Sequence, residues 1–206
     1  MPIMEMKVNM TPEGGGFEHR IMGTQWVHRK TVDGTAALTL ASNYISLEYG
    51  PGDYSTFDAF FSEFAFLITT LSDDFGTSEV DRIGLRYINE IRLPGRALDW
   101  DGIIRDELVA AIKAPAVANG RLLRSMHQVI EQHGDDQVIL NYGIFNPDYP
   151  APVVQRFFIL DVDCNRQGLI QTTEALACVR QLNVLATEAF ESNIDDGLRK
   201  FMEVVQ

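Results

Sequence analysis

The chain has 206 residues, 46% of them hydrophobic and 22% charged, so it is long enough to bury a core and has a globular composition. Seventeen Lys and Arg residues against 29 Asp and Glu residues give a formal net charge of −12, which argues against general nucleic-acid binding because phosphate backbones repel such a surface. No apolar stretch reaches the roughly 18 residues that a membrane span needs.

The number of cysteines and the N-terminal residues indicate the cellular compartment. Cys164 and Cys178 are few for a secreted protein, and the segment 1–5 lacks the basic region and apolar run of a signal peptide. We therefore expect a cytoplasmic protein with reduced thiols, folded as a single domain over residues 1–206.

Residues 1–16 have two interpretations. Apolar residues alternate with polar ones from Met4 to Met10, which is typical of a short edge strand, until the glycines at 14–16 interrupt the pattern. A weakly ordered leader with scattered methionines explains the same residues. Residues 20–49 alternate more regularly, with turn residues between the runs, and predict a three-stranded antiparallel meander.

A helix is expected from Ser55 to Leu71, because phenylalanines recur there every three or four residues and Ser55 with Asp58 resembles a capping box. The segment 82–93 then alternates as a strand, with arginines on one face and aliphatic residues on the other. We expect the phenylalanine-rich helix to cover that aliphatic face. A shorter amphipathic helix is expected between Trp100 and Ile112.

The second half repeats this order. Strands are expected at 122–133, 137–145 and 153–164, followed by a long helix from Thr172 or Thr173 and a terminal helix capped by Asn193. The sequence therefore predicts an α+β, two-layer fold with a twisted, mostly antiparallel sheet and helices packed on one face. The order also allows two β-β-β-α halves, residues 20–113 and 121–206, although no residue-level repeat is visible.

The octapeptide R-I-G-L-R-Y-I-N, residues 82–89, carries a family resemblance, together with the segment 158–163 and the ending from Phe190 onward. The chain resembles a sporadically distributed bacterial family of uncharacterised proteins marked by this strand motif. The resemblance runs from about Trp26 to the C-terminus and implies a bacterial cytosolic protein, but no activity, cofactor or catalytic residue. The chain departs from the family at its start, where members carry a longer Pro-Pro-led segment.

Two groups of charged residues are candidate ligand contacts. Arg82, Arg86 and Arg92 share one strand face and could hold a carboxylate or phosphate, while Asp161 and Asp163 share the face of another strand and could hold Mg²⁺. The simpler interpretation is that these side chains pair with one another across the sheet. If the two strands are neighbours, Arg86 with Asp161 forms a structural network.

Other chemistry has weaker support. The four histidines are scattered and the two cysteines lie on different elements, so we expect no metal site, and no catalytic residue or cofactor is predicted. Tyr142, Tyr149 and the proline-rich loop 147–152 are a third candidate surface, since exposed aromatic residues beside prolines often form contacts; loops of this composition are more often simple turns.

The leading hypothesis is a non-enzymatic, regulatory or antitoxin-like protein that binds a protein partner, or itself, through the open face or edge of its sheet. The alternative is a small-ligand domain in which a cavity between sheet and helix holds an anionic group near Arg86. A hydrolase or transferase is the third hypothesis, and it requires a buried polar cluster.

Overall fold

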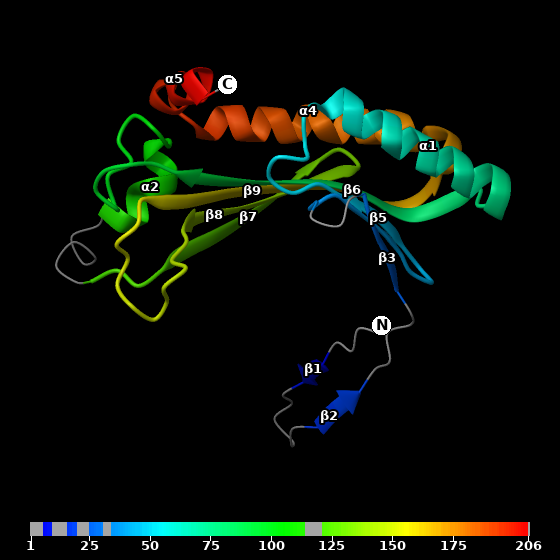
Figure 1. The fold of residues 1–206 in the computed structure, drawn as a ribbon, viewed down its shortest axis with the longest axis horizontal. Helices are drawn as coiled ribbons and strands as arrows, with labels where there is room; N and C mark the ends of the chain where they lie inside the picture. Colours follow the sequence, from blue (N-terminus) through cyan, green and yellow to red (C-terminus); the bar gives the residue numbers. More distant parts are fainter. Residues whose placement is uncertain (1–5, 10–15, 20–24, 31–33, 114–120, 206) are drawn as a thin grey trace. The chain divides into compact units, whose positions relative to one another are not determined.

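A computed structural model describes residues 6–9, 16–19, 25–30, 34–113 and 121–205 (Figure 1). The chain forms two compact units, Met1–Leu71 and Ser72–Gln206, and each is described by itself. Helices and antiparallel sheets occur together, so the α+β class is confirmed. The expectation of one domain over residues 1–206 stays a prediction. Among the described residues, the helices include none whose length and apolarity would let it cross a membrane.

The first unit contains two small sheets. Strand β1 (Met6–Asn9) pairs with β2 (Gly16–His19) in a two-stranded sheet of their own, so a strand lies where one of the two interpretations of the N-terminus placed one. Strands β3 (Trp26–Arg29), β4 (Ala37–Leu40) and β5 (Ile45–Glu48) form the expected three-stranded meander.

Helix α1 (Phe57–Phe75) confirms the phenylalanine-rich helix but differs from the expectation at both ends. The Thr56 hydroxyl, rather than Ser55, accepts the backbone N–H of Ala59 at 3.2 Å and caps the helix. The helix continues four residues past Leu71 and ends before Gly76, whose φ of 67° suits the residue that follows a helix.

The second unit contains a four-stranded antiparallel sheet in the order β6-β9-β8-β7. Its strands are β6 (Glu79–Arg92), β7 (Ser125–His133), β8 (Asp136–Ile144) and β9 (Phe157–Gln171). The expected strand 153–164 is therefore wrong at both ends. As far as Arg166, β9 pairs with β8 on one side and β6 on the other, and from there to Gln171 it continues beside β6, so the strand does not end at 164.

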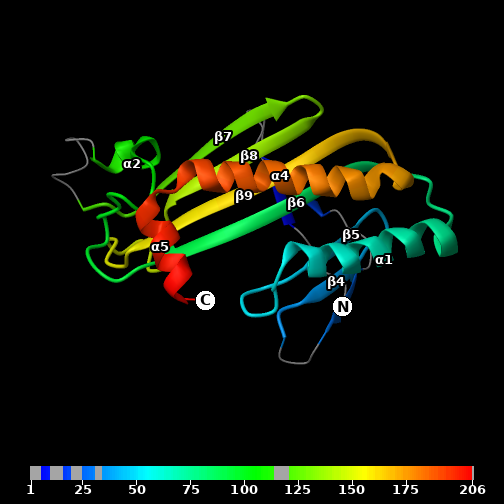
Figure 2. The ribbon, with the colours of Figure 1, turned by 90° about the horizontal axis from the view of Figure 1, so that it is seen from above.

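Helix α4 (Ala175–Asn193), entered through a short 3₁₀ turn (Thr172–Glu174), packs on β6, β8 and β9 (Figures 1 and 2). The hydroxyl of Tyr87 on β6 donates to the Asn183 side chain of α4 at 2.8 Å. Ile83 and Leu85 are buried while Arg82 and Arg86 are exposed, so the two faces of this strand are as predicted. Within the second unit, α4 covers this aliphatic face. The expectation that α1 also covers it stays a prediction, because α1 lies mostly in the first unit.

The expected helix Trp100–Ile112 is also only partly correct. Helix α2 (Asp106–Lys113) begins later, and Trp100 and Ile104 are fully buried in the turns before it. Ile104 forms an antiparallel bridge with Ile194, which joins these turns to the link between α4 and α5 (Asp196–Val205). Asn193 does not cap α5: its side-chain amide donates to Ala189 of α4 at 2.7 Å.

Candidate interaction surface

All five predicted ligand residues lie on the sheet face opposite α4, because β6 and β9 pair over nearly their whole length. The Arg86 guanidinium donates to both carboxylate oxygens of Asp161, from Nε at 2.8 Å and Nη2 at 2.7 Å. Asp161 is only 5% exposed and also accepts from Asn141 at 3.2 Å. The hydrogen bond to Asp161 raises the pKa of Arg86. The conditional prediction of an Arg86–Asp161 network is therefore confirmed.

The other two arginines are also engaged. Arg82 lies 3.6 Å from Asp163, and its guanidinium passes close over Gly84. A Cβ added to Gly84 would lie 3.1 to 3.3 Å from the nitrogen and carbon atoms of this guanidinium. The glycine of the R-I-G-L-R-Y-I-N segment thus gives this side chain room. Arg92 contacts Glu90 at 3.1 Å and stacks over Phe157, 3.7 Å from the ring centroid. These contacts make the face a cross-strand charge network.

A second charge pair lies on the opposite face and was missed by sequence reasoning. Arg166 donates to both oxygens of Asp136, at 2.7 and 2.9 Å, and Asp136 is 3% exposed. No sequence spacing joins residues 136 and 166; only the register of β8 against β9 does. This buried pair holds the start of β8 against the centre of the sheet.

The two cysteines are buried near this pair. Burial raises the pKa of both thiols, that of Cys164 to about 12. At neutral pH both thiols therefore stay protonated, which is unfavourable for a nucleophile. Among the residues described, the acidic, histidine and cysteine side chains form no group of three or more that could hold a metal ion.

A groove of about 620 Å³ lies beside α4, over β7 and β8. Apolar side chains contributed by the two strands and α4 line part of it: Val129, Val138, Leu140, Leu185 and Ala189. Polar side chains with ionisable groups also line it: Arg105, Glu107, Glu131, His133 and Glu188. In Figure 2, α4 runs along β9 and β6 and leaves β7 to one side. The groove therefore combines an apolar lining with three carboxylates.

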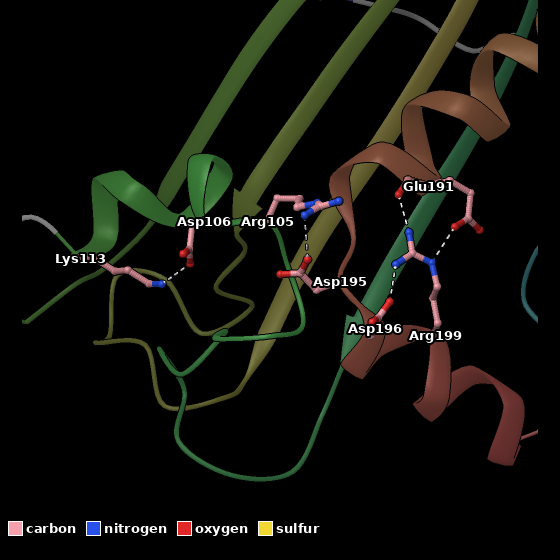
Figure 3. A network of polar contacts seen from close by, with 7 residues as sticks. All are labelled: Arg105, Asp106, Lys113, Glu191, Asp195, Asp196 and Arg199. Atoms are coloured by element: carbon pink, nitrogen blue, oxygen red, sulfur yellow. Dashed lines mark hydrogen bonds and ion pairs between the residues drawn. The ribbon is translucent and has the colours of Figure 1, made fainter.

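Several ionisable groups at and near the groove have local partners. His133 Nε2 lies 3.1 Å from a carboxylate oxygen of Glu131 on the same strand. Arg105 lies 3.3 Å from Asp195, just after α4, while Arg199 of α5 bonds Glu191 of α4 at 3.0 Å (Figure 3). The Arg105 and Arg199 pairs lie at the end of the groove where α2, α4 and α5 meet.

Strand β7 forms the outer edge of the sheet (Figure 2). Within the described residues it pairs with β8 alone, along all nine of its residues. Its last six residues are exposed, including Val129 at 40% and Ile130 at 54%. Sequence reasoning found this strand but not its edge position, because strand order depends on pairing between distant segments.

The two aromatic residues of the third candidate surface, Tyr142 and Tyr149, lie in different places. Tyr142 on β8 lines the groove and stacks on His127 of β7, with ring centroids 5.3 Å apart. Tyr149 is exposed in the loop. A separate hollow of about 380 Å³ is lined by Arg92 and Arg156 among others. Neither this hollow nor the groove is lined by Arg86.

Comparison of the sequence with family models and with curated proteins, and of the fold with solved structures, finds no match.

Proposed function

We propose that this chain is a non-enzymatic, cytosolic interaction protein that binds through the edge strand β7. The observation that carries the proposal is a nine-residue strand that, among the residues the structure describes, pairs with β8 alone and has two adjacent exposed aliphatic residues, Val129 and Ile130. Natural edge strands are usually short or protected by lysine, proline or a bulge. This one has no lysine or proline, and Glu131 is its only acidic residue.

The hairpin geometry identifies the backbone groups that a partner strand would use. His133 pairs with Asp136 across the two-residue loop Gly134-Asp135, so His133 and Asp136 exchange backbone hydrogen bonds. Bonding alternates along an antiparallel pair, so the amides of residues 126, 128, 130 and 132 point away from β8. These amides are the donors that an added strand would satisfy.

The alternatives have less support. An anionic ligand near Arg86 would meet a guanidinium that already bonds Asp161 through Nε and Nη2, at 2.8 and 2.7 Å, and neither hollow described above is lined by this residue. A hydrolase or transferase would need an activated nucleophile, whereas the thiols of Cys164 and Cys178 have raised pKa values. Membership of the bacterial family marked by the R-I-G-L-R-Y-I-N strand stays part of the proposal, as does the regulatory role.

Site-specific photocrosslinking in the producing cell tests the proposal. A photoreactive phenylalanine at Ile130 is expected to give a discrete adduct, either with another protein or with a second copy. The matched control is the same residue at Leu169, which is 72% exposed but lies on β9 rather than at the β7 edge. Absence of an adduct from position 130, or equal adducts from both positions, would refute binding through β7.

A further inference from the structure

We propose that the partner of β7 is β7 of a second copy of this chain, paired antiparallel about Val129. This inference rests on the proposed function and names its partner. It is drawn from the backbone groups left free on the strand, from the register that they allow, and from the charges that this register brings together.

The free backbone groups restrict the register. Two antiparallel β7 strands form backbone hydrogen bonds only when residues with outward amides lie opposite one another. Even-numbered residues of one copy must therefore face even-numbered residues of the other. The arrangement centred on Val129 uses every residue from Ser125 to His133, with Gln128 opposite the partner's Ile130 and Val129 opposite the partner's Val129. A centre at residue 128 or 130 would leave strand ends unpaired.

Charge complementarity favours the same register. Centring on Val129 places Glu131 opposite the partner's His127 on both sides of the two-fold axis. A centre at residue 130 would instead oppose His127 to the partner's His133 and Glu131 to the partner's Val129. Opposite charges or donor–acceptor pairs across a ladder stabilise it, while like charges destabilise it. Although the chain carries a net charge of −12, this strand has only one acidic residue, so local repulsion is small.

The symmetry extends the groove. A two-fold axis between antiparallel edge strands runs perpendicular to the sheet, so both copies present the same face on the same side. The result is an eight-stranded sheet in which the two α4 helices flank β8-β7 and their partner strands. Each groove is lined by Val129, Glu131 and His133 of its own β7. The two grooves therefore join into one continuous groove, and residues of both copies line its centre.

Sedimentation equilibrium of the full chain from about 10 to 300 µM tests the association. We expect a mass of twice 23.1 kDa at the upper end. Ile130→Pro removes only an outward amide, so the chain should fold while its dissociation constant rises at least about tenfold. Folding is checked by circular dichroism, and Gln128→Pro serves as a second variant should Ile130→Pro fail to fold.

Cysteine crosslinking tests the register. Val129→Cys faces its own copy in a non-hydrogen-bonded pair, a spacing that suits a disulfide, and should give a covalent dimer under mild oxidation. Ile130→Cys is more exposed in the free chain, 54% against 40%, but faces Gln128, so it should crosslink at least about fivefold more slowly. The two native cysteines are buried, so they should not form disulfides that interfere with crosslinking at position 129 or 130.

Different results would refute binding through β7 and self-pairing of β7. A strictly monomeric chain at all concentrations, or faster crosslinking at 130 than at 129, overturns the self-pairing inference. In that case a cellular adduct between position 130 and a different protein would still support binding through β7. Absence of any adduct would remove both.

Discussion

At the residue scale, the charged side chains on the exposed sheet face act on the protein's own structure. The Arg86 guanidinium supplies two of the three described hydrogen bonds that reach the buried Asp161 carboxylate, and Arg82 reaches Asp163 by crossing Gly84. A buried carboxylate without partners is costly, because it loses its hydration. The octapeptide 82–89 is thus explained by strand alternation, by room for Arg82 and by the partner of Asp161.

Replacing Arg86 with alanine should therefore lower the free energy of unfolding by about 2 kcal/mol, because Asp161 is left with Asn141 as its described partner. Urea denaturation measures the change. Arg82→Ala is the matched control: its carboxylate partner is 3.6 Å away and more exposed, so a loss within about 0.5 kcal/mol is expected. Equal losses in both variants would show that burial of Asp161 does not matter.

At the scale of elements, the pairing of β7 with β8 depends on one glycine. Gly143 has a φ of 143°, and a Cβ there would meet the Ser125 carbonyl oxygen on β7. Both the backbone conformation and the close approach of the two strands therefore require the absence of a side chain. The start of the edge strand is held in place by this contact.

Gly143→Ala should destabilise the chain by about 3 kcal/mol and weaken protection from hydrogen exchange along β7 first. Gly168→Ala separates the two causes, since Gly168 also has a positive φ, 116°, but its Cβ would meet nothing within 4 Å. Its expected cost is about 1 kcal/mol. Thermal unfolding and exchange mass spectrometry provide the readouts. A cost for Gly143→Ala no larger than that for Gly168→Ala would mean that the strands can move apart freely.

At the scale of the molecule, the core is concentrated in the second unit. All of the largest fully buried side chains lie between Trp100 and Ile194, within residues 72–206. In the described part of the first unit, the buried hydrophobic residues are few: Ala36, Ala37, Phe61 and Ile68. The second unit therefore has the apolar burial that independent folding requires.

A fragment of residues 76–206 should consequently unfold in urea as one cooperative transition, with the circular dichroism of a mixed α and β protein. Gly76 is a suitable start because it follows α1 directly and precedes β6. Tryptophan fluorescence reports on the buried Trp100, the single tryptophan in this fragment. A gradual transition, or an exposed Trp100 in buffer, would contradict an independent core.

Local pattern alone determined the α+β class, the first meander, the phenylalanine-rich helix and the two faces of β6, because alternation and helical spacing report which side of an element is buried. Strand order, the choice of α4 as cover, the Arg166–Asp136 pair and the edge position of β7 were decided only by tertiary structure. Each depends on which distant segments of the chain pair or pack together. The proposed interaction surface belongs to this second group, since a strand lies at the edge of a sheet only when no other strand pairs with its outer side.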